Sequence, residues 1–211
     1  RGGYFFLYEY GNLFLENRYT DWGNYYPYRT LRNLWMLSRY VAPERLQIEF
    51  LNNHRNPGKY KPEDPFAPGK VPFEYIFAIT MPAQPLAWFE GSNLYPEAFA
   101  ASSVVKRYRE IMNDLHSGII LPVGNEPDGR SFTGFQSIKD EGGYLLLFRE
   151  DTAEEEDLIK TWLPADCTFN FELLLGNGKS FTGSTNCTSD LSVSLPGPYT
   201  YALYRYDAVL Q

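Results

Sequence analysis

The chain has 211 residues, of which 44% are hydrophobic and 17% are aromatic, and its formal net charge is −7. This length suits one large domain or two small ones and is sufficient to bury a proper core. The negative charge and the lack of clustered Lys and Arg argue against nucleic-acid binding, because phosphate neutralisation requires basic side chains. No apolar run reaches about 18 residues, so the sequence predicts no membrane span.

The N-terminal part begins with two short apolar runs, at residues 4–10 and 13–16. The second run leads directly into Glu16, Arg18 and Asp21 within the stretch LFLENRYTDW. A buried strand that ends in a polar cluster is typical of a parallel strand whose carboxyl end reaches a site.

The next segment is predicted to be a helix. Leu31, Leu34 and Trp35 follow helical spacing. Thr30 is expected to cap this helix, and Pro43 is expected to end it.

Strands and helices then continue to alternate. The sequence predicts strands at 46–51 and 85–89 and helices at 73–81 and 96–116. The last helix is the clearest, because its apolar side chains recur three and four positions apart. Such alternation indicates parallel strands joined by crossover helices. Three units cannot close an eight-stranded barrel, so residues 1–117 form either an open α/β sheet or the last strands of a longer (β/α) barrel.

Residues 118–211 have a different sequence pattern from residues 1–117, because short apolar and aromatic runs alternate with Gly- and Pro-rich turns. The predicted strands are 119–123, 134–138, 144–149, 169–175, 191–195 and 200–206. This spacing predicts an antiparallel β-sandwich. The acidic run 154–157 is expected to be a solvated loop.

Neither the cysteines nor the histidines indicate a metal site. Cys167 and Cys187 lack metal-ligand spacing, and the Asp and Glu residues are not clustered with the two His. The two cysteines could form a disulfide, but nothing in the sequence requires one, so the redox compartment stays open.

The order of these elements resembles a known family. The stretch ENRYTDW, the helix LRNLWMLSRYV, the Asn-rich loop with His54 and the strand PLAWFE follow one another before a long helix and a β-sandwich. This layout is similar to the C-terminal half of α-galactosidase-like glycoside hydrolases, the melibiase group. The resemblance implies the last strands and helices of a (β/α)8 barrel over 1–117, followed by an antiparallel β domain over 118–211. It implies no cofactor.

The resemblance also implies a retaining mechanism with two carboxylates about 5–5.5 Å apart, one as nucleophile and one as acid/base. Arg18 and Asp21 best match the family's Arg and acid/base Asp. Two residues separate them where the family usually has one, so Glu16 is an alternative acid. By strand order the nucleophile precedes Arg1, so this chain is expected to lack it.

Several residues near the predicted strand ends are candidates for substrate contact. Trp22 flanks Asp21 and would raise its pKa by providing a partly apolar setting. Trp88 is a candidate for stacking on a sugar face. The remaining candidates for contact with sugar hydroxyls are Asn52, Asn53, His54 and Glu90, besides Arg18.

Structural explanations exist for each of the main candidates. Asp21 could be a turn or cap residue, and Glu16 could be a salt-bridge partner of Arg18. His54 could cap a loop, and Trp88 could belong to a barrel core.

The leading hypothesis is therefore a glycosidase that hydrolyses α-linked sugars in the complete enzyme, with a small-molecule or oligosaccharide substrate. The alternatives are a non-catalytic carbohydrate-binding or inactive relative, or a fragment. An incomplete barrel leaves open sheet edges, so self-association or pairing with a missing N-terminal segment is expected. The sequence leaves localisation unknown, with extracellular or periplasmic placement slightly favoured over cytoplasmic.

Overall fold

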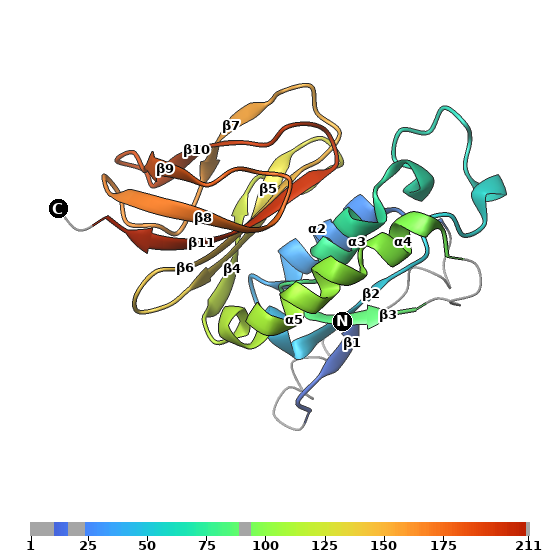
Figure 1. Cartoon of the computed structure of the whole chain (residues 1–211), viewed down its shortest axis with the longest axis horizontal. Helices are drawn as coiled ribbons and strands as arrows, with labels where there is room; N and C mark the ends of the chain where they lie inside the picture. Colours follow the sequence, from blue (N-terminus) through green and yellow to red (C-terminus); the bar gives the residue numbers. More distant parts are fainter. Residues whose placement is uncertain (1–10, 17–23, 89–93, 210–211) are drawn as a thin grey trace.

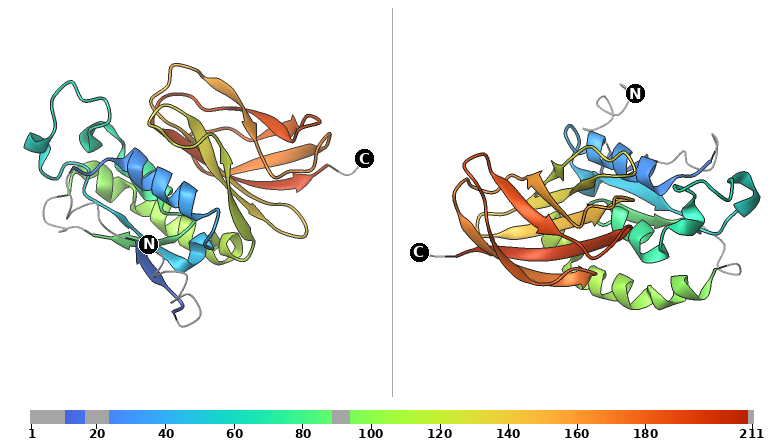
Figure 2. Two further views of the ribbon diagram at one scale, coloured as in Figure 1. Left: turned by 180° about the vertical axis from the view of Figure 1, so that it is seen from behind. Right: turned by 90° about the horizontal axis from the view of Figure 1, so that it is seen from above.

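The computed structural model describes residues 11–16, 24–88 and 94–209. The chain forms a parallel sheet with its helices, beside a larger set of antiparallel strands (Figure 1). The same side-by-side arrangement is visible from behind and from above (Figure 2).

Parallel strands make up the first sheet, in the order β1-β2-β3: Phe14–Glu16, Leu46–Phe50 and Gln84–Ala87. Helix α2 (Pro27–Leu37) lies between β1 and β2 in the chain, and α3 (Phe73–Ile79) lies between β2 and β3. Parallel neighbours need such crossovers, because the chain must return to its starting edge before the next strand. The predicted alternation of strands and helices is confirmed over the described residues.

The predicted start of the first helix is wrong. Helix α2 begins at Pro27, and Thr30 is a buried residue inside it instead of its cap. Proline has a fixed φ and no backbone N–H, so it suits a first helical position without any side-chain cap. The long helix predicted from Pro96 is divided at Ala101 into α4 (Pro96–Ala100) and α5 (Ser102–His116). Proline also begins each of the 3-10 turns Pro43–Arg45, Pro57–Lys59 and Pro68–Lys70.

The antiparallel strands form two sheets. The larger has the order β4-β5-β6-β11-β8-β9: Ile119–Gly124, Phe132–Ile138, Gly143–Arg149, Thr200–Ala208, Thr168–Gly176 and Phe181–Ser184. The smaller pairs β10 (Asp190–Ser194) with β7 (Glu156–Lys160). All six predicted strand positions of this half correspond to strands, and β7 and β9 are additional ones.

The interpretation of residues 154–157 as a loop is partly wrong, because β7 begins at Glu156. In this strand Ile159 is the buried side chain, while Glu156, Leu158 and Lys160 are exposed. A strand at the edge of a small sheet tolerates charged residues on its solvent face, so a strand such as β7 is not recognisable from its hydrophobic pattern.

Two hydrophobic cores lie on opposite faces of the six-stranded sheet. On β6, Leu146 and Phe148 belong to a core shared with the helices, whereas Leu145 and Leu147 belong to a core shared with β10 and β7. Successive side chains of a strand point to opposite faces, so a strand buried on both sides is continuously apolar. The helices, the large sheet and the small sheet therefore form successive layers.

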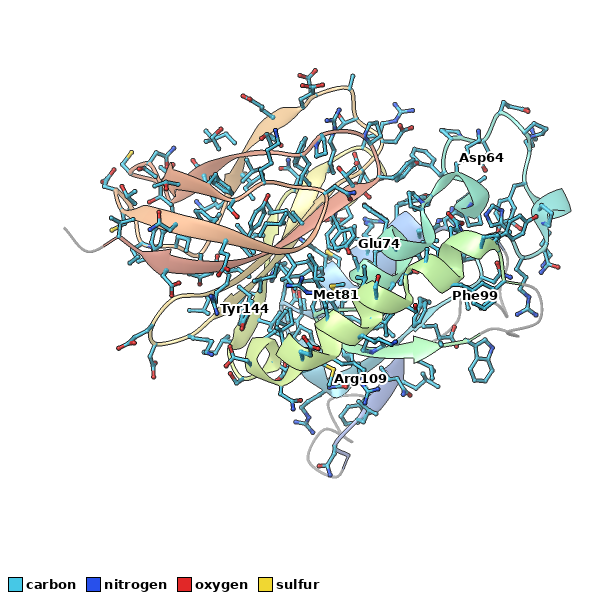
Figure 3. All side chains as sticks on the ribbon, in the orientation of Figure 1. Asp64, Glu74, Met81, Phe99, Arg109 and Tyr144 are labelled. Carbon is cyan, nitrogen blue, oxygen red and sulfur yellow. The ribbon has the colours of Figure 1, made fainter. Side chains whose placement is uncertain are left out.

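The first core joins the two parts of the chain. Tyr201 on β11 is 1% exposed, and its hydroxyl donates a 2.6 Å hydrogen bond to Glu74 Oε1. Glu74 lies on α3 and is labelled in Figure 3. Trp35 Nε1 on α2 donates to the carbonyl of Val123 on β4 at 3.1 Å. The domain boundary at residue 117 stays a prediction, since elements on its two sides share one core.

Both cysteines are free thiols, Cys167 partly buried and Cys187 exposed. Across the described residues, no helix combines the length and the apolar character needed to cross a bilayer.

Candidate functional site

The carboxyl ends of the parallel strands meet at one edge of the sheet. Glu16 ends β1, Asn52 follows β2 and Trp88 follows β3. The backbone N–H of Trp88 donates to the carbonyl of Phe50 at 3.2 Å, which holds the ends of β2 and β3 side by side. Parallel strands bring residues from distant parts of the sequence to the same edge, where ligands bind in open α/β sheets and barrels.

A tight turn after β2 fixes the residues at this edge. The side-chain oxygen of Asn52 accepts the backbone N–H of His54 at 3.0 Å, and its carbonyl accepts the N–H of Arg55 at 3.1 Å. Asn52 and Asn53 are buried. An Asn side chain that bonds the backbone two residues ahead imitates a turn, so it sets the direction of His54.

Glu97, in the first turn of helix α4, contacts two side chains of the turn that follows β2. Its Oε1 accepts a 2.7 Å hydrogen bond from Asn53 Nδ2 and lies 3.0 Å from His54 Nε2. The His54 ring also stacks on Tyr95, with centroids 3.8 Å apart and planes at 28°. We call these residues the Asn53–His54–Glu97 cluster.

The chemistry of the cluster follows from its hydrogen bonds. Asn53 Nδ2 also donates to the Val71 carbonyl at 3.0 Å, so both of its N–H groups have protein partners and it positions Glu97. A carboxylate can only accept, so His54 donates to Glu97 through Nε2. The side chains of His54 and Glu97 are 26% and 43% exposed, which leaves both able to bind hydroxyl groups of a ligand.

The loop that leaves the cluster is attached to the start of α2. The Tyr60 hydroxyl donates to the Tyr25 carbonyl at 2.9 Å and accepts the Tyr25 N–H at 3.0 Å. The Tyr26 hydroxyl donates to Asp64 Oδ2 at 2.8 Å, and this bond raises the pKa of Tyr26. Tyr28 and Phe66 complete a group of neighbouring rings with centroids 5.2–6.0 Å apart.

The structure brings together only some of the predicted site residues. Asn52, Asn53, His54 and the 49%-exposed Trp88 lie at the strand ends. Glu16 ends β1, and its side chain is not described. The other predicted residues lie outside the described residues: Arg18, Asp21, Trp22 and Glu90. The choice between Asp21 and Glu16 as the acid therefore stays open.

Sequence reasoning missed two acidic residues near this edge. In the sequence Glu97 is an ordinary acidic residue in the first turn of a helix. It lies 43 positions from His54 along the chain, so only the fold brings the two side chains together. Glu49, on β2, is fully buried, which is rare for a carboxylate and points to specific partners. Its position inside the run LQIEFL was the one available signal, because a charge within a buried strand is unusual.

Within the described ranges, no group of three or more His, Cys, Asp or Glu side chains is arranged to hold a metal ion.

Comparison with solved structures shows what this fold is similar to. The galactosidase domain of the α-galactosidase-sucrose kinase AgaSK matches with a TM-score of 0.60 and 10% identity, over 87% of this chain and 25% of that one. The GH36 α-galactosidase AgaA of Geobacillus stearothermophilus, solved with raffinose, has a TM-score of 0.60 and 10% identity, over 87% of this chain and 24% of that one. An Anoxybacillus α-amylase has a TM-score of 0.53 and 11% identity, over 88% of this chain and 46% of that one.

No protein-family model and no curated protein sequence matches the chain. The chain spans about a quarter of the length of these α-galactosidases. The resemblance predicted from the sequence is confirmed at the level of fold, as an α-galactosidase-like C-terminal part.

Proposed function

We propose that the chain is part of a retaining glycoside hydrolase that acts on α-galactosides or similar α-linked sugars. Residues 1–117 would supply the last strands and helices of a (β/α)8 barrel, and residues 118–211 a β-sandwich domain. The observation that carries the proposal is the set of parallel strands β1-β2-β3, with the Asn53–His54–Glu97 cluster at their carboxyl ends. Barrel enzymes have their catalytic residues at this end of the strands.

Roles within the proposed site follow from chemistry and from the resemblance. Asp21, or alternatively Glu16, acts as the acid/base, and the nucleophilic carboxylate comes from outside these 211 residues. His54 and Glu97 bind sugar hydroxyls, and Asn53 holds Glu97 in place. Trp88 offers a half-exposed ring for stacking beside them.

The acid/base assignment is tested in a polypeptide that joins this chain to the preceding barrel strands. Asp21→Asn should lower kcat/KM on raffinose by about 100-fold or more, because its leaving group needs protonation. The loss on an activated aryl α-galactoside should be much smaller. Azide should restore turnover and give the α-galactosyl azide, since the second displacement of a retaining enzyme restores the original configuration.

Glu16→Gln is the matched variant, because Glu16 is the alternative acid. The same leaving-group pattern in Glu16→Gln, with Asp21→Asn unaffected, would assign the role to Glu16. Unchanged activity in both variants would contradict the proposed acid/base.

A second candidate function is sugar binding without hydrolysis. The observation that favours this candidate is the hydrogen bonding of Glu97, which accepts from Asn53 and His54. A carboxylate held in this way suits the recognition of sugar hydroxyls. Saturable raffinose binding by the joined polypeptide, with no galactose released, would support this candidate over hydrolysis.

A further inference from the structure

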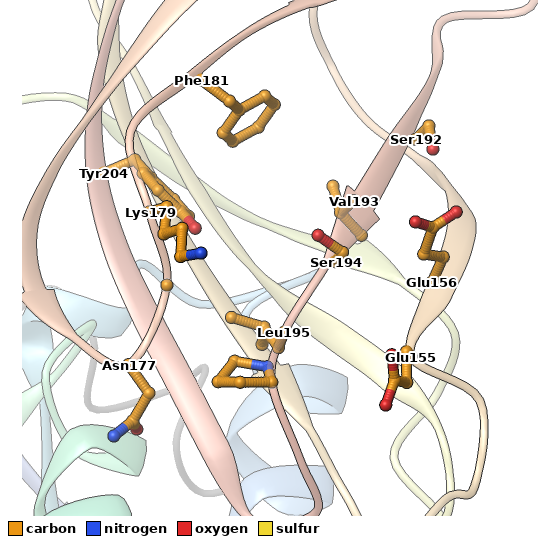
Figure 4. A pocket seen from close by; sticks show the side chains of 12 residues that line it. Glu155, Glu156, Asn177, Lys179, Phe181, Ser192, Val193, Ser194, Leu195 and Tyr204 are labelled. Carbon is orange, nitrogen blue, oxygen red and sulfur yellow. The ribbon is translucent and has the colours of Figure 1, made fainter.

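A cavity of about 350 Å³ lies within the antiparallel half, lined entirely by residues between 155 and 204 (Figure 4). It is separate from the parallel strand ends, because none of its lining residues belongs to β1, β2, β3 or the helices. Its size is within the range of small-molecule sites. We call it the β9–β10 cleft.

The cleft exists because two strands separate. Strand β9 ends the large sheet, and β10 pairs with β7 in the small sheet. An isolated bridge pairs Thr185 with Leu191 beside the connection between β9 and β10. Beyond this bridge the strands belong to different sheets, and the cleft lies between Phe181 on one side and Ser192 to Ser194 on the other.

One wall carries a firmly held aromatic ring. Phe181 is partly exposed, and its ring stacks on Phe171 with centroids 4.5 Å apart and planes at 10°. The ring of Tyr204 is perpendicular to it, with centroids 5.4 Å apart and planes at 87°. A partly exposed ring held by two neighbours offers apolar surface without losing much side-chain entropy when a ligand binds.

The turn between β8 and β9 closes the cleft in a fixed position. A Cβ on Gly178 would lie 2.1 Å from the Tyr204 hydroxyl, so only glycine allows this approach. The backbone of Lys179 hydrogen-bonds the same hydroxyl, and the Asn177 N–H donates to the Tyr201 carbonyl at 2.8 Å. The exposed Lys179 side chain therefore extends from a fixed turn (Figure 4).

The opposite wall is polar. Ser192 and Ser194 are exposed on β10, while Val193 between them is buried and forms part of the floor. Glu155 and Glu156 add carboxylates near the same wall (Figure 4). Because Lys179 also lines the cleft, the cleft carries both signs of charge, so it does not select a strongly charged ligand.

We propose that the β9–β10 cleft binds a neutral saccharide of one or two rings. Sugar C–H faces match the Phe181 ring, while hydroxyl groups both donate and accept. They therefore match the Ser hydroxyls and Glu carboxylates on one wall and the Lys ammonium on the other. This site does not depend on the proposed function, because it lies wholly within the antiparallel half.

The experiment is an NMR titration of the 211-residue chain with raffinose and, separately, with maltose. We expect saturable shifts of backbone amides at 177–181 and 192–194. Lys179→Ala and Phe181→Ala should each raise Kd about 10-fold or more. Lys160→Ala is the matched control, because Lys160 is exposed on the neighbouring β7 outside the cleft. Glu97→Gln should leave these shifts unchanged, which separates this site from the strand ends.

Phe181→Ala removes a packed ring, so its folding is checked by amide dispersion, and Lys179→Ala provides the test if Phe181→Ala unfolds. The absence of saturable shifts with both sugars would overturn the proposal. So would an equal loss of binding in Lys160→Ala. A six-residue peptide copying β10, DLSVSL, is the competing probe. If this peptide shifts 181–184 and 192–194 and neither sugar does, the cleft accepts an extended strand and the saccharide proposal is wrong.

Discussion

At the scale of single residues, Glu150, directly after β6, is a buried carboxylate with a raised pKa. It is 1% exposed, and its Oε2 accepts the backbone N–H groups of Asp128, Gly129 and Ser131 at 3.1, 2.9 and 3.0 Å. Burial raises the pKa of Glu150 to about 7, although the three N–H bonds act in the opposite direction. Its Oε1 has no hydrogen-bond partner within the described part of the chain.

This raised pKa predicts a pH-dependent stability. Between pH 4.5 and about 7, Glu150 keeps its proton in the folded state, whereas the unfolded state, with a carboxyl pKa near 4.5, has lost it. The free energy of unfolding should therefore be highest below pH 4.5 as far as Glu150 is concerned. It should fall by about 3 kcal/mol between pH 4.5 and about 7 and level off above that. Urea denaturation between pH 5 and 8 measures it.

Glu150→Gln removes the titrating group and should flatten this part of the pH profile. Glu154→Gln is the control, because Glu154 is exposed, and it should leave the slope unchanged. A Glu150→Gln profile as steep as that of the wild-type chain would contradict this assignment.

At the scale of elements, the loop between β4 and β5 packs against the loop that follows β2. Gly129 has φ +95, and a Cβ there would lie 2.5 Å from the Phe66 ring. The Arg130 guanidinium lies over the same ring, 5.8 Å from its centroid. The Tyr199 hydroxyl donates to the Pro65 carbonyl at 2.9 Å. These contacts join the antiparallel half to the loop that leaves the cluster.

Gly129→Ala should therefore destabilise the chain by about 1–3 kcal/mol, because it combines an unfavourable φ with a collision against Phe66. Chemical denaturation measures the change. Gly58→Ala is the matched control, since Gly58 lies in the same loop as Phe66 and a Cβ there meets nothing within 4 Å. Equal effects of the two substitutions would show that the contact with Phe66 is energetically unimportant.

The elements were largely predictable, whereas the site was only partly so. Strand β2 and helix α5 carry strong patterns, because burial on defined faces dictates their apolar residues. Strand β9 has the sequence FTGS, which is too short and too polar to stand out. Asn52 to His54 were found because they follow a strand. Glu97 was missed, because only the fold brings it to His54.

At the scale of the whole molecule, the open parallel sheet is the feature that the proposed barrel explains. Within the described residues β1 and β3 are its edge strands. Large apolar side chains on and beside this half are exposed, among them Leu13, Trp88 and Phe99, the last on α4 (Figure 3). Exposed apolar surface next to open strand edges is typical of a face that another segment covers. The other strands of the proposed barrel would cover it and complete the site around Glu97.

The most direct test of this account is kcat/KM for raffinose in the joined polypeptide, compared between Glu97→Gln and Glu110→Gln. Glu110 is an exposed acidic residue on α5, away from the strand ends, and serves as the control. The account predicts a loss of about 10-fold or more for Glu97→Gln, because a hydrogen-bonding carboxylate at the strand ends is replaced. Glu110→Gln should be indistinguishable from the wild-type chain. Wild-type kcat/KM in a folded Glu97→Gln variant would contradict the placement of the sugar site at the carboxyl ends of β1-β2-β3.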